Sequence, residues 1–443
     1  MVEIIRSVYR GIYYPTSRGI HMKPEIKERI EAINRGEIPR GYKRTRAGII
    51  PSDWEIKRIG EISNIFRGAS PRPINDPKWF DESSSIGWVR ISDVTKSTKI
   101  LRETEQYLSQ DGISKSRLVE KGNIIMSICA TVGKPIITGF DVCIHDGFVV
   151  FENPKVNKDF LFYYLLKLED TWKKYGQTGS QMNLNTDIVG NELIPLPNVE
   201  DEQQKIADIL STWDKAIELK EKLIEQKKEQ KKGLMQRLLT GKVRLPGFDG
   251  KWIKLKIKDL IKEVNDRTTQ NNQYEVLSVT KNGIVPQREQ FNKQIASEDN
   301  TGYKIVRRNN LVFSTMNLWM GSLDVLTTHD VGIVSPAYKV FEFIEQNINP
   351  LFGKYFMLSD YMIRIYKMNS EQGASIVRRN LDMDGLLNTI VSVPPVEEQR
   401  EIFKVLQSAD DELTLLCSEL EALKQQKRGL MQLLLSGKVR VKC

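Results

Sequence analysis

The sequence predicts an α+β or α/β fold in which two globular domains are separated by two long antiparallel, coiled-coil-like helices, with a pseudo-two-fold internal repeat. The first observation is a twelve-residue stretch that occurs twice, 196 positions apart: residues 233–244 read GLMQRLLTGKVR and residues 429–440 read GLMQLLLSGKVR. The second is that the same offset relates Glu202-Gln203 to Glu398-Gln399, far upstream of this stretch. A repeat of this length marks a duplicated domain with its connector rather than a solenoid unit.

The globular parts of the two repeats have diverged more than the connectors. Trp54 opens the first repeat and Trp252 opens the second. Further correspondences are weak and consist of single residues beside short apolar runs, namely Asn123 with Asn310, Gly133 with Gly321 and Phe151 with Phe341. Because the connectors are nearly identical and the globular parts differ, we expect one shared docking surface and two different recognition surfaces.

Taken in order, the chain divides into an N-terminal segment, two globular domains and two connector helices. The expected bounds are 1–50 for the N-terminal segment with a short helix at 24–35, 51–198 for the first domain, 199–242 for the central helix, 243–396 for the second domain and 397–443 for the distal helix. Inside the domains, short apolar runs bounded by turn residues predict strands, and apolar residues at helical spacing predict helices. The strands are expected at 122–128, 134–138, 147–151, 311–314 and 337–343, and the helices at 160–172 and 351–367.

The connectors carry the clearest periodicity. From Ile206 to Leu238, and again from Ile402 to Leu434, apolar residues recur in steps of three and four, which predicts one apolar seam along each helix. A helix over residues 201–239 is roughly 60 Å long, and its seam is best covered by the other copy. A glycine after each helix supplies the left-handed cap. The doubled EQKK at 225–232 is interpreted as a polar, solvated stretch of coiled coil, since the register holds on both sides of it.

Composition favours a basic, reducing-compartment protein with two real cores. The 443 residues are enough for two domains of about 150 residues each. The net charge of +9 favours a polyanionic partner. Four scattered cysteines form no disulfide framework or zinc pattern, and three scattered histidines form no metal cluster. The sequence holds no apolar run of membrane-spanning length and no signal-type segment at its start, so we expect a cytoplasmic protein without a membrane partner.

At this point the chain resembles the specificity (DNA-recognition) subunit of type I restriction–modification systems. Each long helix is preceded by a Pro-containing acidic turn followed by Glu-Gln, at residues 197–203 and 394–399, and each is followed by the Gly-Lys-Val-Arg tail. The Gly-Tyr-Lys-Arg-Thr segment at 41–45, leading into Ile50-Pro-Ser-Asp-Trp54, is also similar to that family. The likeness covers about residues 41–443.

The resemblance implies a division of labour between domains and helices. Each domain is expected to be a target-recognition domain that reads one half of a bipartite, asymmetric site in double-stranded DNA. The antiparallel helices are expected to act as a ruler and to dock two methyltransferase subunits, with restriction (motor–nuclease) subunits joining that core. S-adenosylmethionine is expected on the methyltransferase partner, and no cofactor on this chain.

The motifs for catalysis are absent from the sequence. The only Pro-Pro pair lies between Val393 and Val396, which supply neither the polar acceptor nor the stacking ring of an amino-methyltransferase. Thr240-Gly241-Lys242 is a helix cap rather than a phosphate loop, because Val243 replaces the magnesium-binding hydroxyl. His145-Asp146 and His329-Asp330 occupy comparable places in the two repeats, and we interpret them as turn-stabilising pairs rather than catalytic dyads. We therefore predict a non-catalytic subunit without a metal site.

Candidate DNA contacts are polar loop residues able to reach base edges or phosphates. Arginine and lysine suit guanine, asparagine and glutamine suit adenine, and phosphate contact is the safest role for the arginines. In the first domain the candidates are Arg67, Arg72, Arg90, Gln177, Ser180, Gln181 and Asn183. In the second domain they are Arg267, Lys281, Asn317, Gln372, Arg378, Arg379 and Asn380. The candidate partner contacts are the residues preserved between the two connectors, namely Gln236 and Lys242 with Gln432 and Lys438.

Two other functions are compatible with parts of the sequence. A scaffold whose domains bind proteins rather than DNA would share the helices, but the +9 charge and the polar loops count against it. A self-contained restriction–methylation enzyme is disfavoured, because the sequence carries no catalytic motif.

Overall fold

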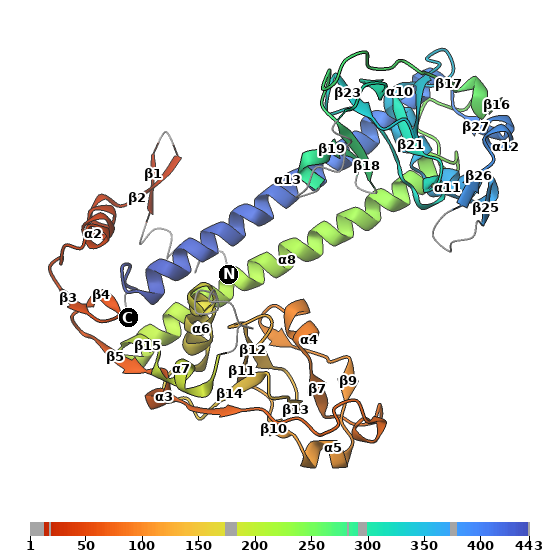
Figure 1. The fold of residues 1–443 in the computed structure, drawn as a ribbon. Helices are drawn as coiled ribbons and strands as arrows, with labels where there is room; N and C mark the ends of the chain where they lie inside the picture. Colours follow the sequence, from red (N-terminus) through yellow and green to blue (C-terminus); the bar gives the residue numbers. More distant parts are fainter. Residues whose placement is uncertain are drawn as a thin grey trace. The chain divides into compact units, whose positions relative to one another are not determined.

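The computed structural model describes residues 13–16, 19–172, 184–280, 283–290, 299–372 and 379–441. The chain forms two compact units, one made of residues 1–219 and 420–443 and the other of residues 220–419. The two longest helices are α8 (Glu200–Leu238) and α13 (Val396–Leu435), and each contributes residues to both units (Figure 1). Each unit is therefore a globular domain together with part of both helices.

The first unit starts with a small N-terminal portion and continues into a mainly β-sheet domain. The N-terminal portion holds β1 (Tyr13–Thr16), β2 (Gly19–Met22), α2 (Pro24–Asn34), β3 (Tyr42–Thr45) and β4 (Gly48–Pro51). The domain follows with β5 (Trp54–Arg58), α3 (Ile59–Ile62), β6 (Asn64–Arg67), η1 (Pro77–Trp79), β7 (Gly87–Val89), α4 (Ile91–Lys96), β8 (Ile100–Leu101), β9 (Gln106–Tyr107), α5 (Gln110–Ser114), β10 (Arg117–Val119), β11 (Ile124–Ser127), β12 (Pro135–Thr138), β13 (Val142–Ile144), β14 (Phe148–Glu152), α6 (Lys158–Trp172), α7 (Thr186–Asn191) and β15 (Leu193–Pro197).

The second unit contains a domain with a related order of elements. These are β16 (Ile253–Lys256), η3 (Ile257–Asp259), β17 (Ile261–Glu263), β18 (Leu277–Thr280), β19 (Gly283–Pro286), α9 (Gln287–Gln290), β20 (Lys304–Arg307), β21 (Leu311–Ser314), η4 (Leu318–Met320), β22 (Leu323–Val325), β23 (Val331–Val334), β24 (Tyr338–Phe343), α10 (Pro350–Met357), α11 (Asp360–Met368), β25 (Ser370–Gln372), β26 (Arg379–Leu381), α12 (Met383–Asn388) and β27 (Ile390–Val393).

The central sheets of the two domains share four strands in the same order, and the first sheet has a fifth strand at one edge. In the first domain the order is β6-β14-β11-β12-β8, and in the second it is β17-β24-β21-β22. Ile124 lies opposite Phe151 in the first sheet, and Leu311 lies opposite Phe341 in the second. A second antiparallel pair also recurs, β10 with β13 and β20 with β23. The weak correspondences in the sequence therefore mark equivalent strands.

The start and the end of each domain lie side by side. The first strand, β5, pairs antiparallel with the last strand, β15, with Trp54 opposite Pro197. In the second domain β16 pairs in the same way with β27, with Ile253 opposite Val393. Because the long helix begins directly after the last strand, this pairing places the first turn of the helix beside the start of its own domain.

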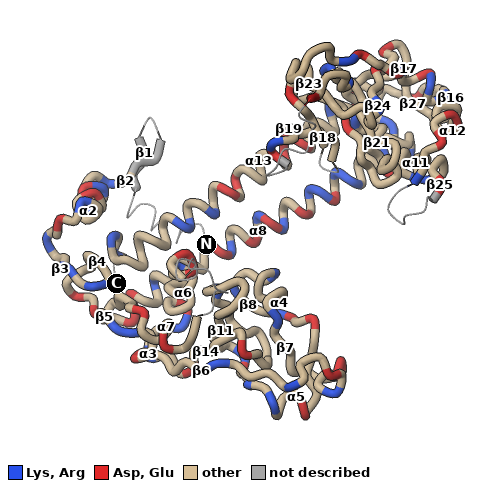
Figure 2. Tube along the Cα trace, in the orientation of Figure 1, with Lys and Arg blue, Asp and Glu red and all other residues tan. Residues whose placement is uncertain are grey.

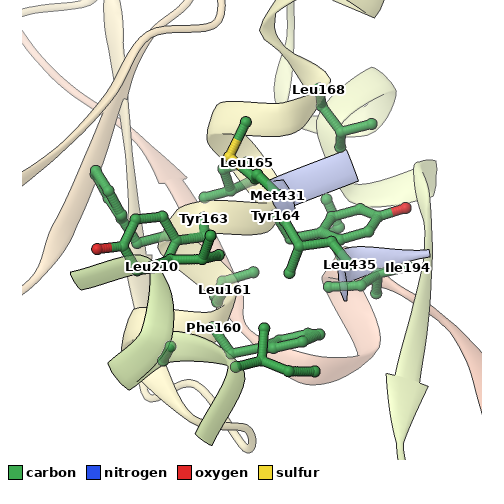
Figure 3. Close-up of a cluster of buried hydrophobic side chains, with 14 of the residues drawn as sticks. Phe160, Leu161, Tyr163, Tyr164, Leu165, Leu168, Ile194, Leu210, Met431 and Leu435 are labelled. Carbon is green, nitrogen blue, oxygen red and sulfur yellow. The ribbon is translucent and has the colours of Figure 1, made fainter. Parts of the chain in front are cut away.

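One domain helix packs between the two long helices in each core. In the first unit, Phe160, Tyr164 and Leu168 of α6 are buried with Leu210 of α8 and Leu435 of α13 (Figure 3). In the second unit α10 takes this place, with Phe352 and Phe356 buried beside Leu406 of α13 and Leu238 of α8. Burial of such aromatic side chains supplies about 2–3 kcal/mol each. The apolar contacts of the long helices are thus largely with the domains.

Ion pairs join α8 to α13 inside each unit. In the second unit Lys220 pairs with Glu419 at 2.8 Å and Lys227 pairs with Glu412 at 2.7 Å. In the first unit Lys427 pairs with Asp214. Between the two pairs of the second unit the residue number rises in α8 and falls in α13. The two helices are therefore antiparallel in that unit.

Several elements differ from the sequence-based expectation. The predicted helices at 24–35 and 160–172 are confirmed as α2 and α6, whereas the single helix predicted at 351–367 is wrong. That segment forms two helices, α10 and α11, because the Ser359 hydroxyl accepts a hydrogen bond from the Met362 N–H and caps a new helix.

The glycine after helix α13 gives a stability prediction, with a glycine in an open position as its comparison. Gly437 has φ +68°, and a Cβ added there would lie 2.4 Å from Cδ of Pro51. Gly247 has a similar φ of +85° with no atom within 4 Å of such a Cβ. We expect G247A to cost about 1 kcal/mol of unfolding free energy, from the left-handed backbone alone. G437A should cost roughly 2–4 kcal/mol, because overlap adds to the same strain.

Chemical denaturation of both variants measures the difference. Equal losses for G437A and G247A would show that the tail of α13 is not held against Pro51.

Candidate nucleic-acid interface

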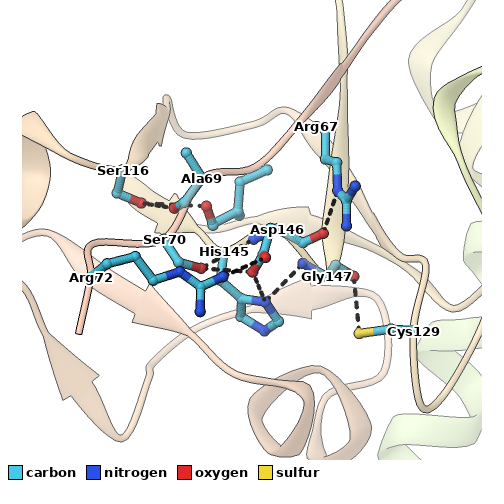
Figure 4. A network of polar contacts seen from close by, with 10 residues as sticks. Arg67, Ala69, Ser70, Arg72, Ser116, Cys129, His145, Asp146 and Gly147 are labelled. Carbon is cyan, nitrogen blue, oxygen red and sulfur yellow. Dashed lines mark hydrogen bonds and ion pairs between the residues drawn. The ribbon is translucent and has the colours of Figure 1, made fainter. Parts of the chain in front are cut away.

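Two predicted DNA contacts of the first domain converge on Asp146. Arg67 Nε donates to the backbone oxygen of Asp146 at 2.7 Å, and Arg72 pairs with its carboxylate at 3.0 Å (Figure 4). Ser70 Oγ donates to the same carboxylate at 2.7 Å. The Ser70 hydrogen bond, and next the Arg72 charge, hold the pKa of Asp146 below its usual range. The side chain of Arg72 is 69 % exposed, so it can still reach a phosphate if it exchanges partners.

His145 stabilises the turn that carries Asp146. Its Nδ1 accepts a hydrogen bond from the Gly147 N–H at 2.9 Å, and its ring packs 4.8 Å from the ring of Phe148. Burial lowers the pKa of His145. Because Nδ1 of His145 already accepts a hydrogen bond from the backbone of its own turn, the ring has a structural role. The Ser70 hydroxyl donates to Asp146 and not to the imidazole, so the three residues do not form a catalytic arrangement.

The two His-Asp pairs are not equivalent, and the expectation that they occupy comparable places is wrong. His145 follows β13, whereas His329 precedes β23, the strand that corresponds to β13. His329 Nδ1 lies 2.8 Å from Thr328 Oγ1, and Asp330 instead pairs with Arg308 at 2.8 Å. The similarity of the two dipeptides is a coincidence of composition at neighbouring turns.

Arg90 is half-buried and supports its own domain. Its Nε donates to the Gln106 side chain at 2.9 Å, and its guanidinium lies 5.6 Å from the centre of the Trp88 ring. Burial lowers the pKa of Arg90. These contacts hold Arg90 in the domain, so of the three predicted arginines it is the least available to DNA.

In the second domain the structure brings predicted contacts together beside one turn. Arg379 pairs across a hairpin with Gln372, and its N–H donates to the Met316 oxygen at 3.4 Å. Its guanidinium lies 4.8 Å from the centre of the Trp319 ring, and its Nε is buried without a hydrogen-bond partner among the described residues. Asn317 begins the same turn, and Asn380 is exposed next to Arg379.

Arg267 is the one further candidate of this domain among the described residues. Arg267 is exposed and donates to the Gly302 oxygen at 2.9 Å, away from this turn in the sequence. Six predicted contacts lie outside the described residues: Gln177, Ser180, Gln181, Asn183, Lys281 and Arg378.

The positive charge of the chain is not on the long helices. Acidic and basic residues alternate along α8 and α13 (Figure 2). Helix α8 has nine acidic and nine basic residues, and α13 has eight acidic and five basic. The net charge of +9 therefore arises outside the helices, where a polyanion would find it.

The predicted partner contacts occupy different environments in the two copies. Gln236 donates to Asp360 at 3.1 Å, while Gln432 is exposed. Lys438 donates at 2.7 Å to the side chain of Asn34, the last residue of α2, whereas Lys242 is exposed. The N-terminal portion thus contacts one of the two tails, and the lysine of the other tail is exposed.

Several residues that are identical in the two repeats make internal contacts that the sequence did not predict. Arg244 makes a paired hydrogen bond with Glu398, 2.6 Å at each oxygen, and Arg440 does the same with Glu202 at 2.6 and 2.8 Å. Glu398 has a 0 % exposed side chain and Glu202 a 4 % exposed one. The two arginines are 196 positions apart, and so are the two glutamates. This shared offset is the sequence signal that could have indicated the two pairs.

The neighbouring glutamines are also internal. Gln203 accepts from the Asn157 N–H at 2.9 Å, and Gln399 accepts from the Asn349 N–H at 2.7 Å. Each thereby holds the turn that leads into α6 or α10. The Glu-Gln dipeptide in the first turn of each long helix is thus a structural clamp.

The family of the chain is identified by comparison with known proteins. A family model described as "Type I restriction modification DNA specificity domain" matches residues 51–228 and again residues 250–425. The chain belongs to this family. The specificity subunits that give the family its name are the non-catalytic part of type I restriction–modification systems, in agreement with the absence of catalytic motifs.

Relatives match over almost their full length. The type I restriction enzyme MjaVIII specificity subunit of Methanocaldococcus jannaschii is 23% identical over 432 residues, covering 89% of this chain and 94% of the relative. The putative MjaX specificity subunit of the same organism is 26% identical, covering 90% and 97%. A solved structure, "Structural basis underlying complex assembly and conformational transition of the type I R-M system", has the same fold, with a TM-score of 0.58, 15% identity and coverage of 88% and 99%.

None of the helices in the described ranges is long and apolar enough to cross a membrane. The same part of the chain contains no cluster of three or more His, Cys, Asp or Glu that could hold a metal ion.

The Arg244–Glu398 contact gives a second prediction. We expect R244Q to lose roughly 3 kcal/mol of unfolding free energy, because it leaves the buried Glu398 carboxylate without its partner. The value lies at the low end of the range for buried pairs, since the Arg244 side chain is 25% exposed. The double variant R244Q/E398Q should recover part of the loss, because no buried charge remains unpaired.

Denaturation of both variants measures this. If the double variant is less stable than R244Q by the full cost of a second substitution, the two residues do not act as a pair.

Proposed function

We propose that this chain is the sequence-specific DNA-binding subunit of a type I restriction–modification complex. Each domain reads one half of a bipartite, asymmetric site in double-stranded DNA. The helices α8 and α13 pair as an antiparallel coiled coil, which separates the domains and docks two methyltransferase subunits, and restriction subunits join this core. S-adenosylmethionine, which supplies the methyl group, binds to the methyltransferase partner. No cofactor binds to this chain.

The proposal rests on one observation: the two domains are built on the same framework but expose different loops. Both domains share a strand order and the same clamp to the long helices, yet their exposed loops differ. Arg67 and Arg72 lie on the first domain, whereas Arg379 and Asn380 lie on the second. A repeated frame with diverged loops suits two different half-sites and two identical partners.

The charge of the second domain and of the flanking segments supports DNA over a protein partner. The long helices together carry no excess of basic residues, whereas residues 1–50 hold 11 basic and 5 acidic residues and residues 243–396 hold 19 and 16. The first domain, residues 51–198, is nearly balanced, with 18 basic and 19 acidic residues. Neutralising one phosphate contact, with Arg72 and Arg379 as the leading candidates, reduces the salt dependence of binding by about one charge.

Domain exchange tests the proposal. Replacing residues 51–198 by the corresponding domain of a related specificity subunit should change one half of the methylated site and leave the other half as it was. The physical reason is that the clamp residues of the second domain are untouched. Methylation-sensitive sequencing of DNA treated with the assembled complex measures both halves.

A matched exchange of residues 243–396 is the control and should change only the opposite half. An exchange that alters both halves, or a wild-type complex that binds no DNA, would contradict the proposal and favour a protein-binding scaffold.

Partner docking is tested at the exposed copy of the preserved lysine. We expect K242E to weaken association with the methyltransferase by roughly tenfold, the scale of one reversed charge at an interface. The control is K251E, an equally exposed lysine nearby that is not part of the repeat. Association is measured by titration of the purified partner, and equal affinities for K242E and K251E would remove Lys242 from the interface.

A further inference from the structure

Each unit contains a partly buried polar triad in which a domain tyrosine meets both long helices. In the first unit Tyr163 of α6 donates to Asp214 of α8 at 2.6 Å, and Lys427 of α13 pairs with the other oxygen of the same carboxylate. In the second unit Tyr355 of α10 donates to Asp410 of α13 at 2.6 Å, and Lys231 of α8 pairs with it.

The two triads are equivalent through the repeat. Asp214 and Asp410 are 196 positions apart, and so are Lys231 and Lys427. Each lysine also lies over the ring of its tyrosine, at 5.5 Å in the first unit and 5.6 Å in the second. The helices exchange roles, since α8 supplies the aspartate in one unit and the lysine in the other.

The tyrosine of each triad is buried and the two charged groups are partly exposed. Tyr163 is 0% exposed and Tyr355 is 7% exposed, the lysine side chains are 14% and 22% exposed, and the aspartate side chains are 27% and 33% exposed. Two further groups complete the surroundings: Lys99 lies 3.3 Å from the Tyr163 hydroxyl, and Gln407 lies 3.4 Å from that of Tyr355. Burial, and next the nearby aspartate, raise the pKa of both tyrosines, so both hydroxyls keep the proton that they donate.

We propose that these triads are positioning residues that set how many unread base pairs separate the two half-sites. The inference rests on the proposed function. The apolar contacts of α6 and α10 with the long helices have no directional preference of their own, whereas a charge-assisted hydrogen bond is short and directional. One base-pair step is about 3.4 Å and one residue of helix about 1.5 Å. A domain that shifts along the helices by two or three residues would therefore accept the wrong spacing.

The triad differs from the other ion pairs between the same helices. Lys227 pairs with Glu412 at 2.7 Å, with side chains 30% and 46% exposed, and the contact involves no domain residue. Removal of that pair changes only the contact between the helices, so it provides a matched control.

The test uses the full chain assembled with its methyltransferase and DNA in which the natural half-sites are separated by the natural spacer or by one base pair more or fewer. The variants are Y163F and Y355F, which keep the ring and remove the hydroxyl, their double variant, K427Q, and the control K227Q. The initial methylation rate is measured at each spacer. Thermal melting verifies that each variant is folded.

We expect Y163F, Y355F and K427Q each to raise the rate at altered spacers, relative to the natural one, by about tenfold, the factor that one charge-assisted hydrogen bond contributes. The double variant should exceed either single one, K227Q should match the wild type, and the half-site sequences should stay unchanged. A uniform loss of rate at all spacers, or unchanged ratios, would overturn the inference. A wild-type complex that methylates no DNA would instead contradict the proposed function.

Discussion

The buried pairing of a tail arginine with a helix-start glutamate is the contact on which the rest of the structure depends. Arg244 and Arg440 each cover a carboxylate that is almost fully withdrawn from water, Glu398 and Glu202. A buried carboxylate is unfavourable unless it is paired and hydrogen-bonded, so the helix start and the tail must come together in each unit. The tail belongs to one long helix and the glutamate to the other, and therefore neither unit is complete without both helices.

This constraint explains why the connectors have stayed alike while the domains have diverged. A recognition loop can change without affecting the clamp, because the domain is joined to the helices through its paired first and last strands and through one helix, α6 or α10. A change in the clamp affects both helices at once. In the first unit Asp53 adds a second carboxylate to Arg440 at 2.8 Å, so the frame itself also carries a small difference between its two ends.

The sequence predicted the elements whose pattern is long or repeated. The central helix expected at 201–239 is found as α8 (Glu200–Leu238), because its apolar seam extends over about nine turns. Gly133 and Gly321 were matched by position alone, and both have φ +84°. The sheet order could not be predicted, since short apolar runs do not specify their partners. The triads were missed because helical spacing does not show where a tyrosine hydroxyl lies, and only the structure shows the hydroxyls of Tyr163 and Tyr355 beside Asp214 and Asp410.

The candidate site was predicted less well, for a physical reason. Polar loop residues satisfy one another when no ligand is bound, and the sequence does not show which pairs form. Arg67 and Arg72 converge on Asp146, whereas Arg90 is held by Gln106. Arg379 differs from all three, since it stacks on Trp319 and its Nε has no partner among the described residues. An arginine already held in place by an aromatic ring loses little side-chain entropy on meeting a phosphate or a base.

Identity between the two tails is therefore weaker support for an external contact than it first suggests. In Gly-Lys-Val-Arg, the glycine has a left-handed backbone at both copies, with φ +69° at Gly241 and +68° at Gly437, and the arginine is the clamp. The valine differs, since Val439 is 2% exposed and Val243 is 47% exposed. That leaves the lysine, whose charge has no internal role at Lys242 that the described residues reveal. A preserved residue without a structural task is the best candidate for contact with a partner, and an exposed valine beside it adds apolar area where that partner would bind.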